Sequence, residues 1–260
     1  MIEPDLKIVT GIVTRNFRIA EGIYEMTVGT DVCKTFIPGQ FINIYLDDKS
    51  MLLPRPISIC EASADNVTII YRTAGKGTEQ LSNYSAGRQI RISTPLGNGY
   101  NIKEDYTGKQ AALLAGGIGI PPMVALAKAL KEKNASVNIF LGFQSEVFLT
   151  DKFGKVSDSL FFSTEGGNAG FHGNVVELLR GNGSVYDEYF ACGPEGMLKA
   201  LCGYAAEAER DIQVSVEERM GCGYGACLWC SCRIREGAEI VKKSVCKHGP
   251  VFFGKELVWN

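Results

Sequence analysis

The residues most able to do chemistry are four cysteines near the C-terminal end of the chain. Cys222, Cys227 and Cys230 follow the spacing CxxxxCxxC, and Cys246 lies further along. Four thiolates suit an iron–sulfur cluster or a tetrahedral zinc ion. Structural zinc sites usually pair their ligands in two short CxxC motifs, whereas a plant-type [2Fe–2S] cluster uses CxxxxCxxC and one distant cysteine. Because only one CxxC motif is present, the spacing favours the [2Fe–2S] cluster and leaves zinc as the alternative.

The loop that carries the first ligands is rich in glycine. Gly221, Gly223 and Gly225 let backbone amides turn toward the sulfur atoms of a cluster, in conformations that side chains would obstruct. Buried thiols or disulfides are the alternatives, but buried cysteines are usually scattered through a core, and disulfides are typical of secreted proteins. Cys232 alternates with Cys230 at the start of an expected strand, so we interpret Cys232 as a packing residue.

Length, charge and composition limit the remaining possibilities. At 260 residues the chain exceeds a typical single domain, so we expect two compact domains and a small cysteine module. The net charge of −2 arises without long blocks of either sign, so a nucleic-acid partner is not expected. Residues 1–5 carry acids and no basic region leads into an apolar run, which predicts no signal peptide. Thiols that must stay reduced indicate a cytoplasmic location.

One long apolar stretch, residues 111–130, has the hydropathy of a membrane span. Its glycines and the pair Pro121-Pro122 divide it into a short strand, a turn and a helix. We therefore expect no membrane segment.

The first part of the chain has the pattern of an antiparallel β-barrel or sandwich. Short runs of β-branched and aromatic residues alternate with glycine, proline, aspartate and asparagine, and one helix is expected at residues 78–84. We place this domain at residues 1–103. The expected strands are residues 7–15, 23–28, 40–46, 57–61, 67–73 and 89–93.

After residue 106 strands and helices alternate, which predicts a doubly wound parallel sheet with helices on both faces. This second domain should occupy residues 104–212, with a linker near residues 102–108, and the cysteine module should occupy residues 213–260. The expected strands are residues 110–115, 137–142, 160–163 and 189–192, and the expected helices are residues 121–133, 174–180 and 194–210.

The barrel carries residues with the chemistry of a phosphate site. Arg55 starts a strand, Arg72 ends another, and Gly77 begins the helix. A guanidinium, a glycine that admits close backbone approach and a helix N-terminus can together bind a pyrophosphate. Each feature alone is weak, because an arginine is more often a solvated surface residue and a glycine can simply begin a helix.

The second domain carries two glycine loops. Gly116, Gly117 and Gly119 follow a buried strand and precede a helix, where glycines let a dinucleotide pyrophosphate approach backbone amides. The spacing departs from GxGxxG and a tight turn is the alternative, but three glycines in four residues exceed what a turn needs. Cys192 and Gly193 repeat the geometry after the last strand. Both loops should lie at the carboxyl edge of the sheet, where such folds bind ligands.

These motifs in this order, RPxS, GxGT, AGGxGxxP and CGPxGM, resemble the ferredoxin–NADP reductase superfamily over nearly all of residues 7–210. The sequence MGCGYGACLWCSC, followed by VCKHGPVF, resembles the electron-transfer subunits of class 1B dihydroorotate dehydrogenases. The resemblance implies a FAD-binding barrel, an NAD-binding domain and a C-terminal [2Fe–2S] module.

The resemblance also implies which residues bind each group. The cluster ligands would be Cys222, Cys227, Cys230 and Cys246. The nicotinamide nucleotide would bind at Gly116, Gly117 and Gly119, with Cys192 and Gly193 near its ring. FAD would bind through its phosphate at Arg55, its isoalloxazine at Pro56, Ile57 and Ser58, its ribityl chain and pyrophosphate at Ile70, Tyr71 and Arg72, and at the helix start through Gly77 and Thr78.

Two departures from the wider superfamily matter. Many relatives have a tyrosine where Ile57 stands, so stacking on the flavin must come from elsewhere, for which Tyr71 is a candidate. NADP-specific relatives place serine and arginine after the second strand of the nucleotide domain, to hold the 2′-phosphate. Here residues 143–146 offer the acid Glu146 and no arginine, which favours NAD.

The implied function is an electron relay. In the family, electrons from dihydroorotate reach FMN on a partner subunit and then pass through the cluster and FAD to NAD⁺, and we expect two copies of each subunit. Catalytic acid–base residues are not needed for this task, and His172 and His248 are interpreted as loop residues. The alternatives are a reductase subunit of another complex, of the NADH-dependent ferredoxin:NADP oxidoreductase or sulfhydrogenase type, and a zinc-stabilised binding module without enzymatic activity.

Two apolar residues within the ligand loop suggest a contact surface. A soluble monomer rarely exposes side chains such as Leu228 and Trp229, so we expect them to meet the FMN-bearing subunit. The alternative is that Trp229 shields the cluster from within.

Overall fold

A computed structural model describes residues 6–48 and 50–259 of the chain. The expectation for residues 1–5, that they form no signal peptide, lies outside these residues. Among the residues described, no helix has the length and hydropathy of a membrane span.

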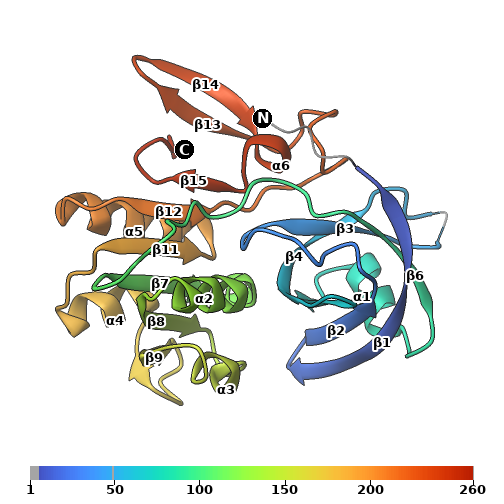
Figure 1. The fold of residues 1–260 in the computed structure, drawn as a ribbon, viewed down its shortest axis with the longest axis horizontal. Coiled ribbons are helices and arrows are strands. Elements are labelled where there is room, and N and C mark those ends of the chain that lie inside the picture. Colours follow the sequence, from blue (N-terminus) through green and yellow to red (C-terminus); the bar gives the residue numbers. More distant parts are fainter. Residues whose placement is uncertain (1–5, 49, 260) are drawn as a thin grey trace.

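Antiparallel strands close the first domain into a barrel in the order β1-β2-β5-β4-β3-β6, which confirms the predicted barrel (Figure 1). Alternate residues of β1 and β2 point inward, so Val13, Met26 and Val28 belong to the barrel core. The helix α1 (Lys76–Ser82) follows β5. The strands are β1 (Ile8–Ala20), β2 (Ile23–Gly29), β3 (Phe41–Tyr45), β4 (Arg55–Ala62), β5 (Asn66–Arg72) and β6 (Gln89–Ser93).

The second domain is built on a sheet with the order β10-β9-β8-β7-β11-β12-β15. Its pairs are parallel except β12 with β15, which is antiparallel. The strands are β7 (Gln110–Gly116), β8 (Ser136–Phe143), β9 (Ser159–Thr164), β10 (Phe171–His172), β11 (Glu188–Cys192), β12 (Ile212–Ser215) and β15 (Val251–Phe253). The helices are η1 (Gly117–Gly119), α2 (Pro122–Glu132), α3 (Thr150–Phe153), α4 (Val175–Asn182) and α5 (Glu195–Glu207).

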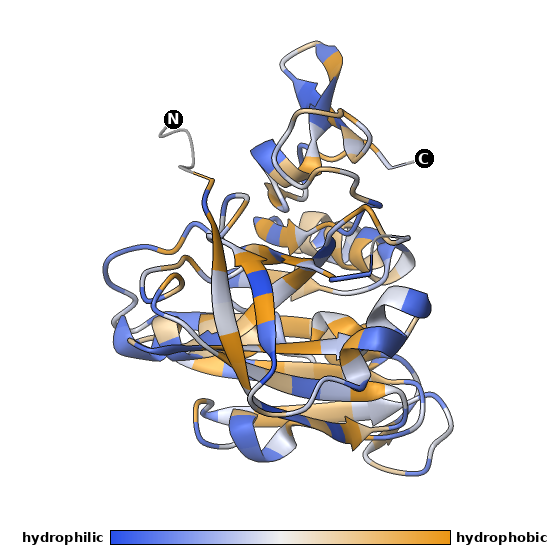
Figure 2. Ribbon diagram, turned by 90° about the vertical axis from the view of Figure 1, so that its right-hand side faces the viewer, coloured by the Kyte–Doolittle hydropathy of each residue, from blue (hydrophilic) through white to orange (hydrophobic). Residues whose placement is uncertain are grey.

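Helices cover both faces of this sheet, as predicted. Leu113 of the central strand β7 shares a core with Met123 of α2. Its neighbour Leu114 points to the opposite face and shares another core with Leu179 of α4 and Leu198 of α5. Figure 2 shows apolar residues concentrated along the strands of both domains.

The C-terminal part adds a hairpin and then returns to the sheet. β13 (Ser231–Glu236) and β14 (Glu239–Ser244) pair antiparallel, and α6 (Val245–His248) leads into β15. The sequence did not predict β12 or β15. Because β12 pairs with β11 and β15 pairs with β12, part of residues 213–260 completes the sheet of the second domain. Ile234 of the hairpin and Phe252 of β15 belong to the same apolar cluster. The domain boundaries at residues 103 and 212 stay a prediction.

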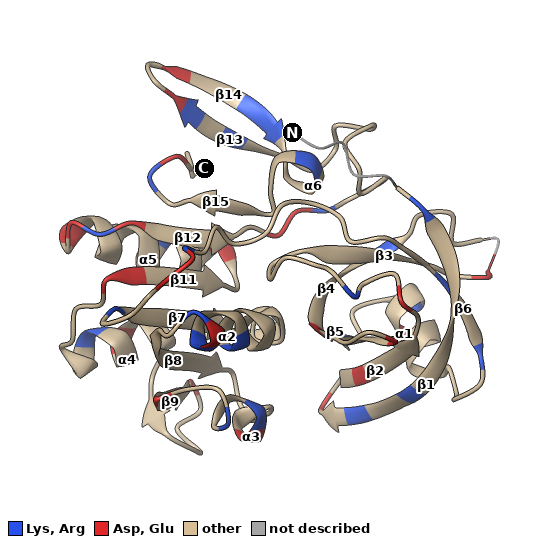
Figure 3. Ribbon diagram, in the orientation of Figure 1, with Lys and Arg blue, Asp and Glu red and all other residues tan. Residues whose placement is uncertain are grey.

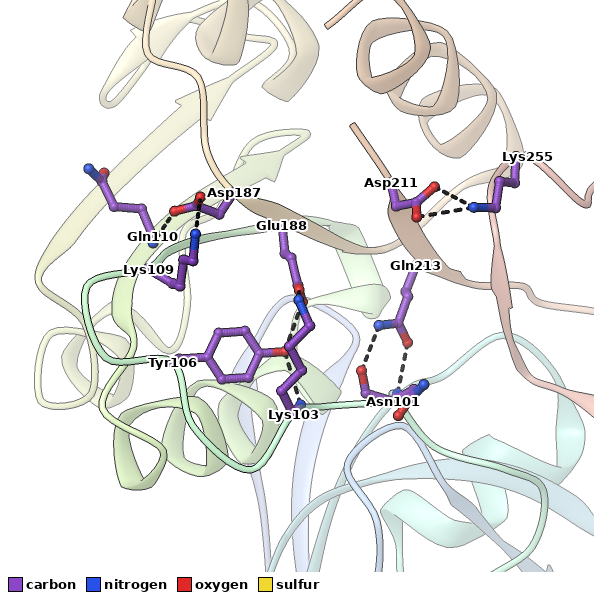
Figure 4. Close-up of polar contacts among 10 residues, drawn as sticks. All are labelled: Asn101, Lys103, Tyr106, Lys109, Gln110, Asp187, Glu188, Asp211, Gln213 and Lys255. Carbon is purple, nitrogen blue, oxygen red and sulfur yellow. Dashed lines mark hydrogen bonds and ion pairs between the residues drawn. The ribbon is translucent and has the colours of Figure 1, made fainter. Parts of the chain in front are cut away.

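Polar contacts fasten the linker between the two domains to β11 and β12 (Figure 4). The Asn101 backbone exchanges two hydrogen bonds of 2.8 Å with the Gln213 side chain. The Tyr106 hydroxyl donates to Glu188 at 2.8 Å, and Lys103 forms an ion pair with the same carboxylate. These contacts fix the point at which the chain leaves the barrel.

A charged network joins the barrel to the second domain directly. Lys152 of α3 lies 3.3 Å from the buried carboxylate of Glu25 and 2.6 Å from that of Glu61, and Lys128 of α2 also pairs with Glu61. Elsewhere basic and acidic residues are mixed along the ribbon (Figure 3). The network thus connects α2 and α3 of the second domain to β2 and β4 of the barrel.

Candidate functional site

The four predicted cluster cysteines come together in two pairs. The Cys227 amide donates to the Cys222 sulfur at 3.5 Å, and the Cys246 amide donates to the Cys230 sulfur at 3.5 Å. The Gly225 amide joins the pairs, because it lies in the first ligand loop and donates to the Cys246 sulfur at 3.0 Å.

This arrangement matches the way a [2Fe–2S] cluster is held. Such a cluster takes two sulfurs for each of its two irons. The pairs Cys222–Cys227 and Cys230–Cys246 therefore fit a two-iron cluster.

Two glycines give the ligand loop its course. Gly223 and Gly225 have φ angles of +80° and +91°, which residues with a side chain rarely adopt. A Cβ on Gly223 would lie 2.5 Å from the side-chain Nδ2 of Asn43, and a Cβ on Gly225 would lie 2.8 Å from the Lys247 side chain. Asn43 of β3 donates to the Cys222 carbonyl at 2.8 Å, so the barrel itself helps to position the loop.

Cys222 and Cys246 differ in acidity. Burial raises the pKa of Cys222, but the amides of Tyr224 and Cys227 outweigh burial and lower that pKa to about 7. Burial, followed by the hydrogen bond and charge of Cys230, raises the pKa of Cys246 to about 12. A bound metal deprotonates a coordinating thiol by its own charge, so Cys246 depends more than Cys222 on the metal for its thiolate form.

A groove of about 1010 Å³ connects the cluster loop to the barrel. Arg55 and Pro56 of β4 and Gly77 at the start of α1 line its barrel side, and Cys227 lines the other side. A Cβ on Gly77 would overlap the Arg55 guanidinium, so the absence of a side chain here lets the guanidinium lie against the start of α1. The guanidinium beside the backbone of a helix start fits a pyrophosphate. Predicted phosphate residues and a predicted cluster ligand thus share one groove.

Not every predicted flavin residue faces this groove with its side chain. Thr78 lines it, but its hydroxyl accepts from the Ala74 amide at 2.9 Å and donates to the Gly75 carbonyl at 3.0 Å. Three other predicted flavin residues do not line the groove, and their contacts with FAD stay a prediction. They are Ile57, Ser58 and Ile70.

Tyr71 requires a correction. Its ring is buried in the barrel and stacks on Tyr24 with a centroid distance of 5.9 Å, while its hydroxyl donates to Asn16 at 3.0 Å. A ring held in this way cannot also stack on a flavin. The expectation that Tyr71 supplies the missing stacking partner is therefore wrong, and any role in FAD binding would fall to its backbone.

A second cavity, of about 750 Å³, lies at the carboxyl ends of β7, β8 and β11. Gly116, Gly117, Gly119 and Gly193, from the two predicted loops, all line it. The loops pack backbone to backbone, because a Cβ on Gly119 would lie 2.5 Å from the Cys192 carbonyl oxygen. Cys192 is buried behind this surface, and burial raises the pKa of its thiol to about 12.

Arg72 belongs to the barrel but reaches the second cavity. It ends β5, lines the nucleotide cavity together with Glu217, and lies 3.5 Å from where a Cβ on Gly117 would be. The predicted role of Arg72 on the FAD pyrophosphate stays a prediction. Its position brings the barrel and the nucleotide loop into contact at the end of the cavity nearest the flavin groove.

The acid expected to select NAD is placed elsewhere. The Glu146 carboxylate accepts the Glu21 amide of the β1–β2 turn at 2.6 Å, and it is absent from the described lining of the nucleotide cavity. The residues that line this part are Gln144, after β8, and Glu165, after β9. Sequence reasoning missed Glu165, although its place directly after a predicted strand was a usable signal.

Apolar side chains surround the flavin groove. Trp229 lines the groove and is 70% exposed, and its neighbour Leu228 is 67% exposed. Leu52 and Leu53, from the loop before β4, line the same groove and are 86% and 56% exposed. Trp229 therefore does not shield the cluster from within, and the rim has the composition of a contact surface.

Comparisons with known proteins agree with this site. Residues 217–258 match the family described as the iron–sulfur cluster binding domain of dihydroorotate dehydrogenase B. The dihydroorotate dehydrogenase B (NAD(+)) electron transfer subunit of Bacillus pumilus is 41% identical over 251 residues, covering 94% of this chain and 96% of the relative. The subunit of the same name from Clostridium perfringens is 37% identical over 249 residues, covering 95% and 96%.

Solved structures give the same answer for the fold. An NADH-dependent reduced ferredoxin-NADP oxidoreductase structure superposes with a TM-score of 0.85 at 29% identity, covering 96% of this chain and 90% of that one. A flavohemoglobin from Malassezia yamatoensis, at 18% identity and a TM-score of 0.64 with 78% and 57% covered, shares the fold alone.

Fold and site together define a flavin- and iron–sulfur-dependent oxidoreductase of the ferredoxin reductase class. The similarity to curated relatives extends over nearly the whole length of both chains. The chain belongs to the family of electron-transfer subunits of dihydroorotate dehydrogenase B.

Proposed function

We propose that this chain carries electrons from the flavin of a dihydroorotate-oxidising catalytic subunit to NAD⁺, as a step in pyrimidine biosynthesis. The observation that carries the proposal is the shared groove, in which Arg55 and Gly77 lie on one side and Cys227 on the other. A flavin bound there would lie beside a cluster held by Cys227. The family to which the chain belongs supports the substrate and the acceptor.

The chain's own residues would bind and orient the groups. Arg55 and the backbone at Gly77 would hold the FAD pyrophosphate, and the four cysteines would hold the [2Fe–2S] cluster. When bound, the flavin exchanges single electrons with a cluster and a hydride with nicotinamide, which no side chain can do. The glycine loops would place the nucleotide at the carboxyl edge of the sheet, and Arg72 closes that cavity on the barrel side.

The partner would meet the rim around the ligand loop. Leu228 and Trp229 are exposed apolar residues between the ligands Cys227 and Cys230, and the relatives' name, electron transfer subunit, supports a separate catalytic subunit. We propose an FMN-bearing partner, an assembly with two copies of each subunit and a cytoplasmic location, where thiols stay reduced.

The direct test is to co-express the chain with candidate FMN subunits under anaerobic conditions. We expect a complex with iron, acid-labile sulfide and FAD on this chain, and NAD⁺ reduction that depends on dihydroorotate. A colourless protein with one zinc per chain would contradict the proposal at its base. A protein that carries FAD and a cluster but shows no dihydroorotate-dependent NAD⁺ reduction with any FMN subunit would contradict only the substrate.

A second candidate function is favoured by the structure with a TM-score of 0.85. In that reading the chain is the NADH-linked subunit of a ferredoxin-NADP oxidoreductase complex. The partner distinguishes the two, because this candidate requires reduction of NADP⁺ with reduced ferredoxin and NADH and requires no response to dihydroorotate.

A further inference from the structure

We propose that the Glu165 carboxylate determines which nicotinamide dinucleotide the chain uses, by accepting the ribose 2′-hydroxyl of NAD and repelling the 2′-phosphate of NADP. The inference rests on the proposed function only in taking the ligand of this cavity to be a nicotinamide dinucleotide. It adds the residue that selects between the two forms.

The strand register places Glu165 at the edge where a dinucleotide binds. Phe143 of β8 pairs with Thr164 of β9, so Gln144 and Glu165 are the first residues beyond two neighbouring parallel strands. Both line the nucleotide cavity. In open parallel sheets, the acid that binds the adenosine ribose commonly follows the strand next to the glycine-loop strand. Here that position, directly after β8, is the uncharged Gln144, and Glu165 lies directly after the neighbouring strand β9.

Backbone contacts fix this edge in place. The Glu165 amide donates to the Phe143 carbonyl at 3.1 Å, and the Gly166 amide donates to the Gln144 carbonyl at 3.3 Å. The Asn168 side chain donates to the Ser145 carbonyl at 3.0 Å. The loop after β9 is thereby tied to the loop after β8, which holds Glu165 beside Gln144.

The ends of the cavity are not equivalent. Arg72 comes from the flavin-binding barrel, and it lies at the same end as Gly117 and Glu217. The nicotinamide must reach the flavin to exchange a hydride, so the nicotinamide belongs at this end. In the sheet, β8 and β9 lie on the side of β7 opposite to β12, which Glu217 follows, so the adenosine extends over β8 and β9, toward Glu165.

The other acids near this cavity either accept backbone hydrogen bonds or lie at its nicotinamide end. Glu146 accepts the Glu21 amide at 2.6 Å, and Glu177 completes the capping box of α4 by accepting the Asn174 amide at 2.9 Å. Glu217 lies at the nicotinamide end. In the part of the chain that the structure describes, the Glu165 side chain has no ion pair or hydrogen bond, so its carboxylate is free to accept from a ligand.

One basic residue, Arg180, lines the same region but does not neutralise the charge of Glu165. Arg180 forms an ion pair of 3.0 Å with Glu207 and stacks over Tyr204 at 5.2 Å, both on α5. Its charge is thus already paired away from Glu165. A 2′-phosphate beside Glu165 would face a like charge without a dedicated counter-ion, whereas a 2′-hydroxyl would donate to it.

The test compares Glu165→Gln with Glu146→Gln in the flavin- and cluster-loaded protein. We expect Glu165→Gln to raise the ratio of NADPH to NADH oxidation, with ferricyanide as acceptor, by about tenfold or more, because the like charge is removed. Glu146→Gln should leave the ratio unchanged. Calorimetric titration with ADP-ribose and with its 2′-phosphate should show the same shift in affinity, independently of turnover.

The outcomes separate this inference from the proposed function. An unchanged ratio and unchanged relative affinities in Glu165→Gln would overturn the inference, and a change in Glu146→Gln alone would assign selection to the position first expected from sequence. If the wild-type protein oxidised neither nucleotide, the proposed function would fail, while the two titrations would still decide the role of Glu165.

Discussion

The cluster loop and the nucleotide cavity are assembled in opposite ways. All four cluster ligands lie within one short stretch, Cys222 to Cys246, and amides of the same stretch donate to their sulfurs. The nucleotide cavity takes residues from β5, from the ends of four strands of the second domain and from the segment after β12. A site made by local spacing can be recognised in sequence, whereas a site assembled from distant segments depends on how those segments pack.

The largest effect should come from breaking the local site. Cys227→Ser removes the exposed ligand that faces the flavin groove, so we expect the cluster absorbance and dihydroorotate-dependent NAD⁺ reduction to be lost. FAD and NADH-dependent ferricyanide reduction should remain, because Arg55 and Gly77 are untouched. Absorption and electron paramagnetic resonance spectra of anaerobic protein measure this directly.

Cys232→Ser is the matched control for that variant. Cys232 lies two residues after the ligand Cys230, but its sulfur faces the Lys243 carbonyl at 3.7 Å rather than the other cysteines. The Cys232→Ser variant should therefore keep its cluster. Iron bound normally by Cys227→Ser, or lost from Cys232→Ser, would mean that the ligand set is wrongly assigned.

The second effect tests how two distant segments make the flavin site. A Cβ at position 77 would displace the Arg55 guanidinium from the start of α1, so Gly77→Ala should weaken FAD binding by about tenfold. Gly75→Ala is the control, because nothing lies within 4 Å of a Cβ there and its φ of 167° suits any residue. Fluorescence titration of the deflavinated protein with FAD compares them, and equal affinities would separate Gly77 from the flavin.

These two pairs of variants also show what the sequence could predict. Spacing predicted four cysteines that the structure brings together, and strand patterns predicted the barrel and the parallel sheet, because both depend on local order. The assignment of these cysteines as cluster ligands stays a prediction. The failures concern side chains whose direction depends on packing. The pattern places Tyr71 near the flavin, but its ring turns into the barrel against Tyr24, and Glu146 turns to the Glu21 amide of another domain.

Short strands were missed for a related reason. β12 and β15 have four and three residues, so neither is long enough to show a period. β15 is a strand because the chain returns to β12 after the cluster hairpin, and only the folded protein supplies that partner.

A third effect concerns the exposed rim beside the local site. Trp229→Ala should weaken binding of the catalytic subunit by about tenfold, since an exposed tryptophan at the centre of an interface commonly dominates its affinity. Phe171→Ala is the control, because Phe171 is also an exposed aromatic residue but lies on β10, at the far edge of the sheet. Biolayer interferometry with the purified catalytic subunit gives both values, and undiminished binding of Trp229→Ala would move the interface elsewhere.

The smallest effect should come from breaking the ion pairs that join the barrel to the second domain. Lys152→Met removes the cation between Glu25 and Glu61, and we expect a loss of about 1–2 kcal/mol of unfolding free energy because a largely buried carboxylate loses its partner. Lys131→Met, which breaks an exposed pair with Asp158, should cost under about 1 kcal/mol. Chemical denaturation of the FAD-loaded protein measures the difference.

The pH dependence of this loss identifies its cause. Burial acts to raise the pKa of Glu61, but the ion pairs with Lys128 and Lys152 outweigh it and hold the pKa below the ordinary 4.5. A carboxylate with a lowered pKa stabilises the fold above its ordinary pKa and loses that contribution as the pH falls through the folded value. The loss of unfolding free energy in Lys152→Met should therefore be full near neutral pH and should shrink below about pH 4. A deficit that stayed constant down to acid pH would show that lost packing of the lysine stem, rather than the ion pair, joins the two domains.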